Sequence, residues 1–183
     1  MVRYAGFWPR FAAGLIDAVV LLPFIAFGVW SLSSSYTAAL LTQVPLAVLF
    51  ASYNIYFVGR WGQTVGKMAM KIQVQRLDGG TVHFTHAFYR HSIDLGFSII
   101  NTVLLIVAFL SFSGSEYNVL DFAGKMELYE KHTPKIAGTI ENLALIWIGS
   151  EMVVLFLNEK RRALHDFIAG TVVVHLRCAD SAG

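Results

Sequence analysis

Residues 11–30 read FAAGLIDAVVLLPFIAFGVW, an apolar run interrupted only by Asp17 and Pro23. A helix needs about 20 mainly apolar residues to cross a hydrocarbon core about 30 Å thick. The run therefore predicts a membrane-spanning helix. It follows Arg3 and Arg10 directly, and no small-residue cleavage site comes after it. We therefore expect a retained span and not a cleaved signal peptide.

Three further stretches have a similar length and composition, at about residues 37–58, 92–112 and 139–157. The last of them carries two acids, Glu141 and Glu151. The chain of 183 residues is 56% hydrophobic and only 14% charged, whereas soluble domains average about 25% charged residues. A soluble fold with so little charge would expose large apolar patches. We therefore predict one domain over residues 1–183, an all-α membrane protein with about four transmembrane helices.

Lysine and arginine are distributed unevenly over the segments between these spans. The N-terminal tail, the segment between spans two and three and the tail 158–183 hold all but three of the 14 basic residues. The exceptions are Lys125, Lys131 and Lys135, in an acidic loop at about residues 113–138. Cytoplasmic loops carry the excess of Lys and Arg. Both termini are therefore expected in the cytoplasm, and the absence of an organelle-targeting signal favours the inner membrane of a bacterium.

A short β element is predicted at the cytoplasmic surface. Residues 71–84 read KIQVQRLDGGTVHF, in which alternating residues flank Asp78-Gly79-Gly80, a turn sequence that tolerates positive φ. This pattern predicts a β-hairpin at about residues 71–84. Residues 170–176, GTVVVHL, are rich in β-branched residues and could add a third strand. Residues 85–91 are expected to form a brief interfacial helix that enters the third span.

Ionisable residues inside the spans need a physical reason, because each costs about 2.5–3.5 kcal/mol on insertion scales. Asp17 lies about six residues into the first span, and Arg10 stands seven residues earlier on the same helical face. The two lie about 10 Å apart along the axis, so each is expected to find a partner on another helix. Glu151, in the fourth span, should lie at nearly the same depth as Asp17.

Further polar residues gather in the cytoplasmic half of the spans: Asn54, Asp94 and Asn101. This asymmetry suggests a polar cavity that opens inward. The alternative is that these residues pair with one another and hold the helices together. For Asp94 the pairing interpretation is favoured, because Arg90 stands four residues before it.

Three segments resemble the RDD family of membrane proteins: YAGFWPRFAAGLID at 4–17, GQTVGKMAMKIQV at 62–74 and LHDFIAGTVVV at 164–174. The family is named for one arginine and two aspartates. The resemblance carries these to Arg10, Asp17 and Asp166, the last in a His-Asp-x-x-Ala-Gly-Thr segment. Some members are linked to sodium/proton exchange, and others look like partners or regulators of membrane proteins. The resemblance therefore implies a membrane protein without fixing its mechanism.

Residues 62–67, GQTVGK, superficially resemble a phosphate-binding loop. One residue is missing between the glycines, and Met68 stands where Ser or Thr would bind magnesium. We interpret the glycines as a tight turn where span two leaves the bilayer, and we expect Lys67 to meet lipid phosphates.

The other chemistry-bearing residues give weaker signals. His83, His86 and His91 cluster, but their spacing fits neither a zinc-protease helix nor a zinc finger. Cys178 is the single cysteine, and no cofactor or metal is predicted. His165 neighbours Asp166 and could orient it or relay a proton. The sequence contains no paired nucleophile and base, so we do not expect an enzyme, and nothing in it suggests nucleic-acid binding.

Two functions remain open. In the first, the protein is a monovalent cation/proton antiporter in which Asp17 alternates between proton and cation, and Arg10, Glu151 and Asp166 complete the site. Four spans are few for alternating access, so this mechanism would need a homo-oligomer. In the second, the protein is a membrane scaffold or regulator of a partner membrane protein. The arginine and the two aspartates would then lock the helices together, and the hairpin or the acidic loop would bind the partner.

Overall fold

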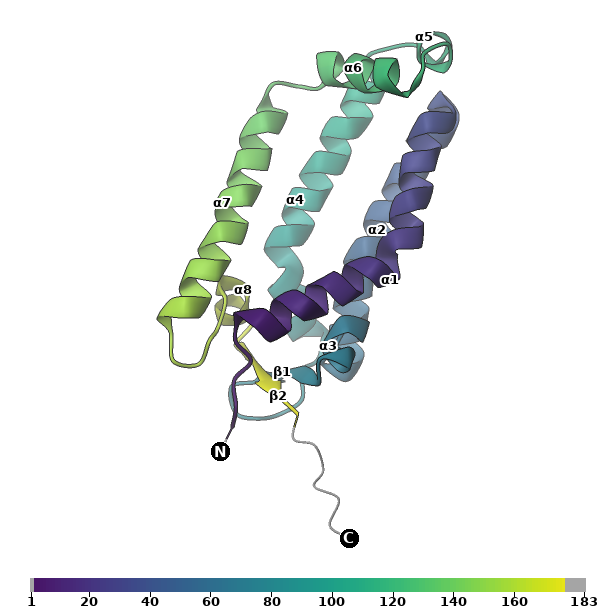
Figure 1. The fold of residues 1–183 in the computed structure, drawn as a ribbon. Helices are drawn as coiled ribbons and strands as arrows, with labels where there is room; N and C mark the ends of the chain where they lie inside the picture. The colour runs from purple at the N-terminus through teal and green to yellow at the C-terminus, as the bar shows by residue number, and fades with distance from the viewer. Residues whose placement is uncertain (1, 177–183) are drawn as a thin grey trace. The chain divides into compact units, whose positions relative to one another are not determined.

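Four helices of the computed structural model, which describes residues 2–176, are long and apolar enough to cross a membrane (Figure 1). They are α1 (Phe7–Ser34), α2 (Tyr36–Trp61), α4 (Phe84–Leu110) and α7 (Ile136–Leu157). Each coincides with one predicted span, so the four-span prediction is confirmed. The predicted interfacial helix at residues 85–91 forms the first turns of α4. Cys178 lies outside the described residues.

The four long helices expose apolar side chains along most of their length. No more than 11% of the most apolar stretch of any of them is buried within the chain. Exposed examples include Val19, Phe27, Val153 and Phe156. A helix that is hydrophobic on all sides is stable when lipid surrounds it. Pro23, inside α1, is tolerated in such a helix because its surroundings can re-satisfy the freed backbone group.

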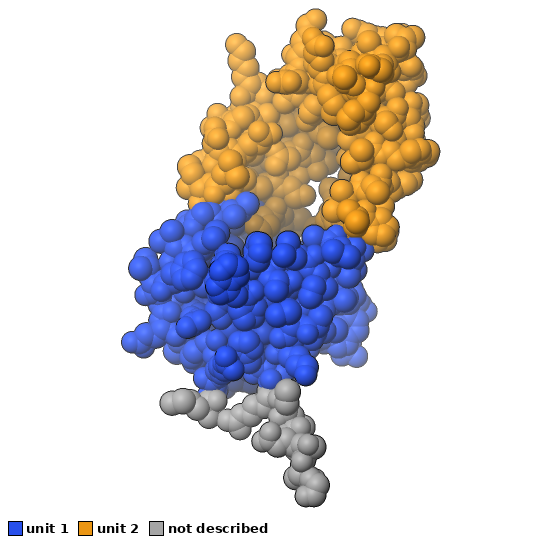
Figure 2. All heavy atoms as spheres, in the orientation of Figure 1, with its two compact units in different colours: residues 1–20, 52–93, 147–183 blue, residues 21–51, 94–146 orange. Residues whose placement is uncertain are grey.

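The chain divides into two compact units, coloured separately in Figure 2. Unit 1 comprises residues 1–20, 52–93 and 147–183, and unit 2 comprises residues 21–51 and 94–146. Unit 1 holds one end of every long helix, the helices α3 (Val65–Ala69) and α8 (Leu164–Ile168), and both strands.

Unit 1 contains a two-stranded antiparallel sheet of β1 (Ile72–Arg76) and β2 (Thr171–His175), in which Val74 pairs with Val173. The hairpin predicted at residues 71–84 is therefore wrong. The chain does turn there, with Gly79 at a φ of 83°, but β1 pairs with the distant β2 and not with residues 81–83. The reason is burial: the first four residues of β2 are all buried, and β-branched side chains suit a covered strand.

The second edge of β2 is occupied by the N-terminal segment. The backbone N–H of Ala5 donates to the carbonyl of Val173 at 2.8 Å, and that of His175 donates to the carbonyl of Arg3 at 2.9 Å. Tyr4 forms an isolated bridge with Val174. The sheet proper has two strands, so the predicted three-stranded element is corrected to two strands flanked by this segment.

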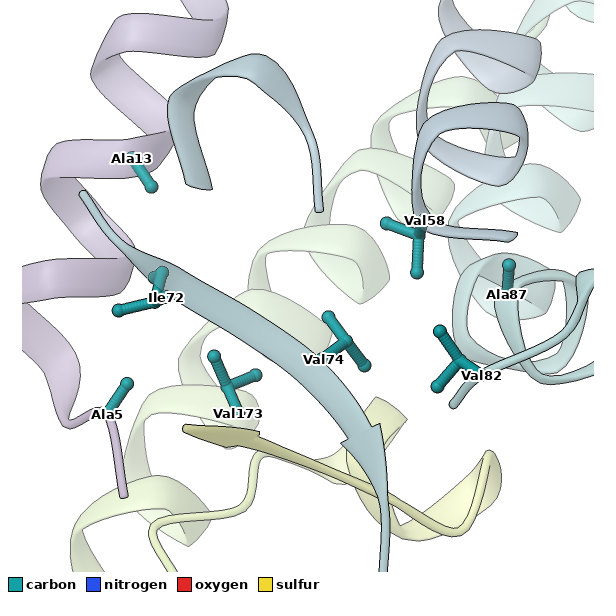
Figure 3. Packing of buried hydrophobic residues seen from close by; sticks show 8 residues of the cluster. All are labelled: Ala5, Ala13, Val58, Ile72, Val74, Val82, Ala87 and Val173. Atoms are coloured by element: carbon teal, nitrogen blue, oxygen red, sulfur yellow. The ribbon is translucent and has the colours of Figure 1, made fainter. Parts of the chain in front are cut away.

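A small apolar core packs the sheet of unit 1 against the helix ends (Figure 3). Its buried side chains are Ala5, Ala13, Val58, Ile72, Val74, Val82, Ala87 and Val173. Three of the eight are alanines, which let backbone segments approach closely. This core joins α1, α2 and α4 to both strands. The segment after α2, and α8 before β2, carry the polar groups described below.

In unit 2 the predicted loop at residues 113–138 folds into two helices, α5 (Gly114–Asn118) and α6 (Phe122–His132). Both begin at a side-chain cap: Ser113 accepts from Glu116 N at 3.2 Å, and Asp121 accepts from Gly124 N at 2.9 Å. Such caps stabilise short helices by satisfying free backbone N–H groups. The segment is therefore ordered through its own capping residues.

These two helices also cap the ends of α1 and α2 within unit 2. The Nζ of Lys125 donates to the carbonyls of Ser33 at 2.6 Å and Ser34 at 3.3 Å. The last carbonyls of a helix have no partner inside it, and a cation beside them is favourable. Asn118 Oδ1 accepts from the first N–H of α2, at Tyr36, over 2.8 Å. The loop therefore closes both helix ends.

Candidate functional site

Asp166, on α8, is the centre of a buried ionic cluster in unit 1 and has no exposed side-chain surface. Its Oδ2 accepts from Arg10 Nη1 at 2.6 Å and from the backbone N–H of Ala163 at 3.0 Å. Its Oδ1 contacts Arg90 Nη1 and accepts from Thr171 Oγ1 at 3.2 Å. We call Arg10, Arg90, Asp166 and Thr171 the Arg–Asp cluster. It joins α1, α4, α8 and β2 through one carboxylate.

The charge state of Asp166 follows from these contacts. Burial would raise the pKa of this carboxyl, but the positive charges of Arg90 and Arg10 lower it further than burial raises it. The pKa of Asp166 therefore lies well below its usual range. The carboxylate stays ionised at neutral pH, as a buried ion pair of this kind requires.

Arg10 also fixes two backbone segments. Its Nε donates to the carbonyl of Ala5 at 3.1 Å, and its Nη2 donates to the carbonyl of Arg161 at 2.7 Å. Arg162 holds the other side of α8, because its Nη2 donates to the carbonyl of Asp166 at 2.9 Å. The planar guanidinium suits such multiple contacts. The N-terminal segment and the chain before α8 are thereby fixed to the same carboxylate.

Asp17, on α1, has its own set of donors. Its Oδ1 accepts from Tyr53 Oη and from the backbone N–H of Gly66, each at 2.7 Å. Its Oδ2 accepts from Thr64 Oγ1 at 2.5 Å. Thr64 is the N-cap of α3, so the carboxylate lies at the N-terminal end of that short helix, where negative charge is favourable. We call Asp17, Tyr53, Thr64 and Gly66 the Asp17 cap.

The segment GQTVGK therefore binds an internal carboxylate. Gly62 makes the turn after α2, with a φ of 69°, so the expected tight turn is confirmed. A Cβ atom at Gly66 would lie 2.0 Å from the carbonyl oxygen of Ala13, so only glycine allows α3 to approach α1 this closely. The Nζ of Lys67 lies 3.4 Å from Thr64 Oγ1, and burial lowers the pKa of this amine to about 8.

Glu151 and His165 form a pair next to the Arg–Asp cluster. His165 Nδ1 contacts Glu151 Oε1. Its Nε2 is buried, has no hydrogen-bond partner within residues 2–176, and lies 3.9 Å from Asp166 Oδ1. Burial and the charge of Arg90 lower the pKa of His165. We therefore assign a neutral imidazole that carries its proton on Nδ1 and donates it to Glu151.

The remaining predicted polar residues lie elsewhere. Asn54 is next to Tyr53 on α2, and its side chain makes no hydrogen bond to the cluster in the described part of the chain. Asp94 and Asn101 are on the part of α4 that belongs to unit 2. Arg90, expected to pair with Asp94, contacts Asp166. The buried polar residues gathered in unit 1 are therefore the arginines, aspartates and the Glu151–His165 pair.

Five members of the Arg–Asp cluster and the Asp17 cap were not predicted as site residues from the sequence: Tyr53, Thr64, Gly66, Arg90 and Thr171. Thr64 and Thr171 are inside the segments 62–74 and 164–174, so their position in those motifs was an available signal. Arg90 was visible only as a basic residue at the start of a span. Tyr53 gave no sequence signal, because a tyrosine near a span end is ordinary.

The site holds each of its two aspartates through several donors. Four basic side chains lie near three acidic ones: Arg10, Lys67, Arg90 and Arg162 near Asp17, Glu151 and Asp166. Asp17 accepts three hydrogen bonds, and Asp166 makes four polar contacts. Within the described residues, no group of three or more His, Cys, Asp or Glu side chains could hold a metal ion. The arrangement can fix helices and hold charge in apolar surroundings.

Four helices that are long and apolar enough to cross a membrane define a multi-pass membrane protein. The chain belongs to the RDD family, whose model matches residues 4–170. The matched region includes Arg10, Asp17 and Asp166, which the structure places in the Arg–Asp cluster and the Asp17 cap. No curated protein and no solved structure matches the chain.

Proposed function

We propose that this protein is a membrane scaffold or regulator that is neither an enzyme nor an ion carrier, and in which the arginine and the two aspartates lock the helices together. The observation that carries the proposal is that both aspartates are held by several donors: Asp17 accepts three hydrogen bonds and Asp166 makes four polar contacts. A carboxylate that exchanges a cation for a proton needs free oxygen lone pairs and partners that can leave. Asp166 is instead buried between two guanidiniums, where loss of its charge is strongly destabilising.

The membrane orientation that goes with this function follows from charge. Unit 1 contains both termini and most of the basic residues, so it faces the cytoplasm under the positive-inside rule. The acidic segment with α5 and α6 then faces the outside of a bacterial cytoplasmic membrane. In this orientation the Arg–Asp cluster lies at the cytoplasmic ends of the spans, close enough to charged headgroups to lower its cost of burial.

The partner is a membrane protein with a basic outer surface. The acids Glu116, Glu127 and Glu130 are exposed on α5 and α6, and these helices are held in place by Lys125 and their own caps. The exposed acids of this segment outnumber its exposed lysines, Lys131 and Lys135, and a surface of net negative charge speeds encounter with a partner of the opposite sign. The ordered acidic segment therefore supports a docking role better than a free loop would.

A proteoliposome assay tests the scaffold proposal. Purified protein is reconstituted with a pH-sensitive dye inside, and Na⁺, Li⁺ or K⁺ is added across a proton gradient. A flat trace from folded protein is expected. Asp17→Asn should lower the folded fraction, because the Asp17 cap loses its charge, while Asp78→Asn at an exposed turn should not. Proton movement driven by one of these cations would contradict the scaffold proposal.

Cation/proton antiport is the second candidate, and one observation favours it. His165 lies between Glu151 and Asp166 with a buried ring nitrogen that has no hydrogen-bond partner among the described residues. Glu151 could then alternate between a cation and a proton relayed by His165, with Asp17 as a second carboxylate and a homodimer as the working unit. Under this mechanism Glu151→Gln abolishes cation-driven proton movement while the protein still folds.

A further inference from the structure

Unit 2 contains a cavity of about 540 Å³, and neither Arg10, Asp17 nor Asp166 is among its lining residues. Small-molecule sites typically occupy roughly 300–1,000 Å³, so the volume suits an organic ligand. The lining comes from the unit 2 portions of all four long helices and from Tyr129 on α6. The atoms of unit 2 leave an opening among them in the space-filling view (Figure 2). Neither the Arg–Asp cluster nor the Asp17 cap contributes to it.

The walls of the cavity are mainly apolar, with aromatic rings from Phe24, Phe50 and Tyr129. Gln43 adds a polar side chain to the lining. Its Nε2 is buried and makes no hydrogen bond to any described residue. A buried amide without a partner is costly. Since a glutamine amide can flip, Gln43 can present either its N–H or its oxygen to a bound molecule. Asn101 provides a second amide in the lining.

Glu141, near the start of α7, is the only charged residue of the lining. Neither lysine, arginine nor histidine lines the cavity with it. The side chain of Glu141 is exposed, so its carboxylate is accessible to a cation and attracts it. The faces of aromatic rings add to this attraction. An anion would be repelled by Glu141 and would find no cationic side chain in the lining, and a small inorganic cation would leave the apolar walls without a contact.

We propose that this cavity binds an amphipathic organic cation, with its charge at Glu141 and its apolar part between Phe24 and Phe50. The lining has one acidic residue and no basic one, which favours a ligand with a positive charge. The apolar walls favour a ligand that also has an apolar part. The inference is independent of the scaffold proposal, because none of the residues that lock the helices takes part. The same contacts would hold the ligand whether the protein is a regulator or a transporter.

Binding of tetraphenylphosphonium to the full chain in lipid nanodiscs tests the proposal. We expect saturable binding above that of empty nanodiscs, and a Glu141→Gln variant that binds at least tenfold more weakly. Glu159→Gln, at an exposed acid just after α7, is the matched control and should bind as the wild type does. Tetraphenylborate, an anion of the same shape, should show no saturable binding. Equal binding of the anion, or unchanged binding by Glu141→Gln, would overturn the proposal.

A second variant separates the cavity from a surface site for lipophilic cations. Ala47 lines the cavity from α2, and Ala47→Phe would fill part of it. We expect this variant to unfold at a temperature close to that of the wild type and to lose tetraphenylphosphonium binding at least tenfold. If Ala47→Phe folds and binds normally, the cation binds elsewhere and the inference fails. Should Ala47→Phe fail to fold, Glu141→Gln still decides the matter.

Discussion

The carboxylate of Asp17 lies 2.7 Å from the backbone nitrogen of Gly66, which donates a hydrogen bond to it. The two residues are 49 positions apart in the chain. The contact brings the start of α3 against α1 so closely that no side chain fits between them. An aspartate inside a span thus has a specific backbone partner, and its polar group is satisfied at a place where an unpaired carboxylate would be costly.

Gly66→Ala should destabilise the protein by about 3 kcal/mol, the upper part of the range for overpacking. The added Cβ would lie 2.0 Å from the carbonyl oxygen of Ala13 and 2.9 Å from Asp17 Cγ, so the Asp17 cap must open. Equilibrium unfolding in detergent measures the loss. Gly14→Ala, on α1 with nothing within 4 Å of the new atom, is the control and should be neutral or slightly stabilising. Equal behaviour of the two variants would refute this role for Gly66.

Asp166→Asn should cost about 3–5 kcal/mol, because it leaves two buried guanidiniums facing each other without an anion. The matched control is Asp78→Asn, which removes the exposed pair with Arg76 and should cost less than about 1 kcal/mol. Both are measured as free energies of unfolding in the same detergent.

A double variant sharpens the Asp166 prediction. Arg90→Met added to Asp166→Asn removes one of the two unpaired cations and should restore part of the lost stability, a non-additive result expected of residues in contact. Strict additivity would mean that Arg90 and Asp166 are not energetically coupled, and the Arg–Asp cluster would not be the lock that we propose.

The spans could be predicted from sequence because membrane insertion depends on a one-dimensional property, the length of an apolar run. The hydrogen-bond partners of the polar residues could not be predicted in this way. Asp17 meets Thr64 and Gly66 through a close approach of backbones, which requires knowledge of how α3 packs. The predicted strand partner of β1 was wrong for a related reason. A turn at Gly79 is a local signal, whereas the choice of β2 as partner depends on which strand is buried.

The cap formed by α6 gives a prediction for unit 2. Lys125→Met should destabilise the protein by about 1–3 kcal/mol, since the carbonyls of Ser33 and Ser34 lose their partner. Hydrogen exchange should also accelerate in residues 113–132, which this contact helps to hold. Lys131→Met, at an exposed position on the same helix, is the control. Unchanged exchange in Lys125→Met would show that the segment is held without this contact.

Acidification should destabilise the protein through His165. Its pKa is lowered in the folded state by burial and by Arg90 on α4, against the opposing charges of Glu151 on α7 and Asp166 on its own helix. The unfolded chain therefore binds a proton more readily. Stability from this group is fully present above about pH 6.5, the ordinary value for histidine, and declines as the pH falls below it toward the folded pKa.

The expected slope reaches at most about 1.4 kcal/mol per pH unit. Unfolding free energies of the wild type and of His165→Gln, measured from pH 7.5 to 5.5, check it. The variant loses the contact with Glu151, so it should be less stable at pH 7.5 but should lose less on acidification. His83→Gln, at an exposed position, should keep the wild-type slope. A slope that survives in His165→Gln would assign the pH dependence to another group and remove the support for a neutral, proton-accepting His165 beside Glu151.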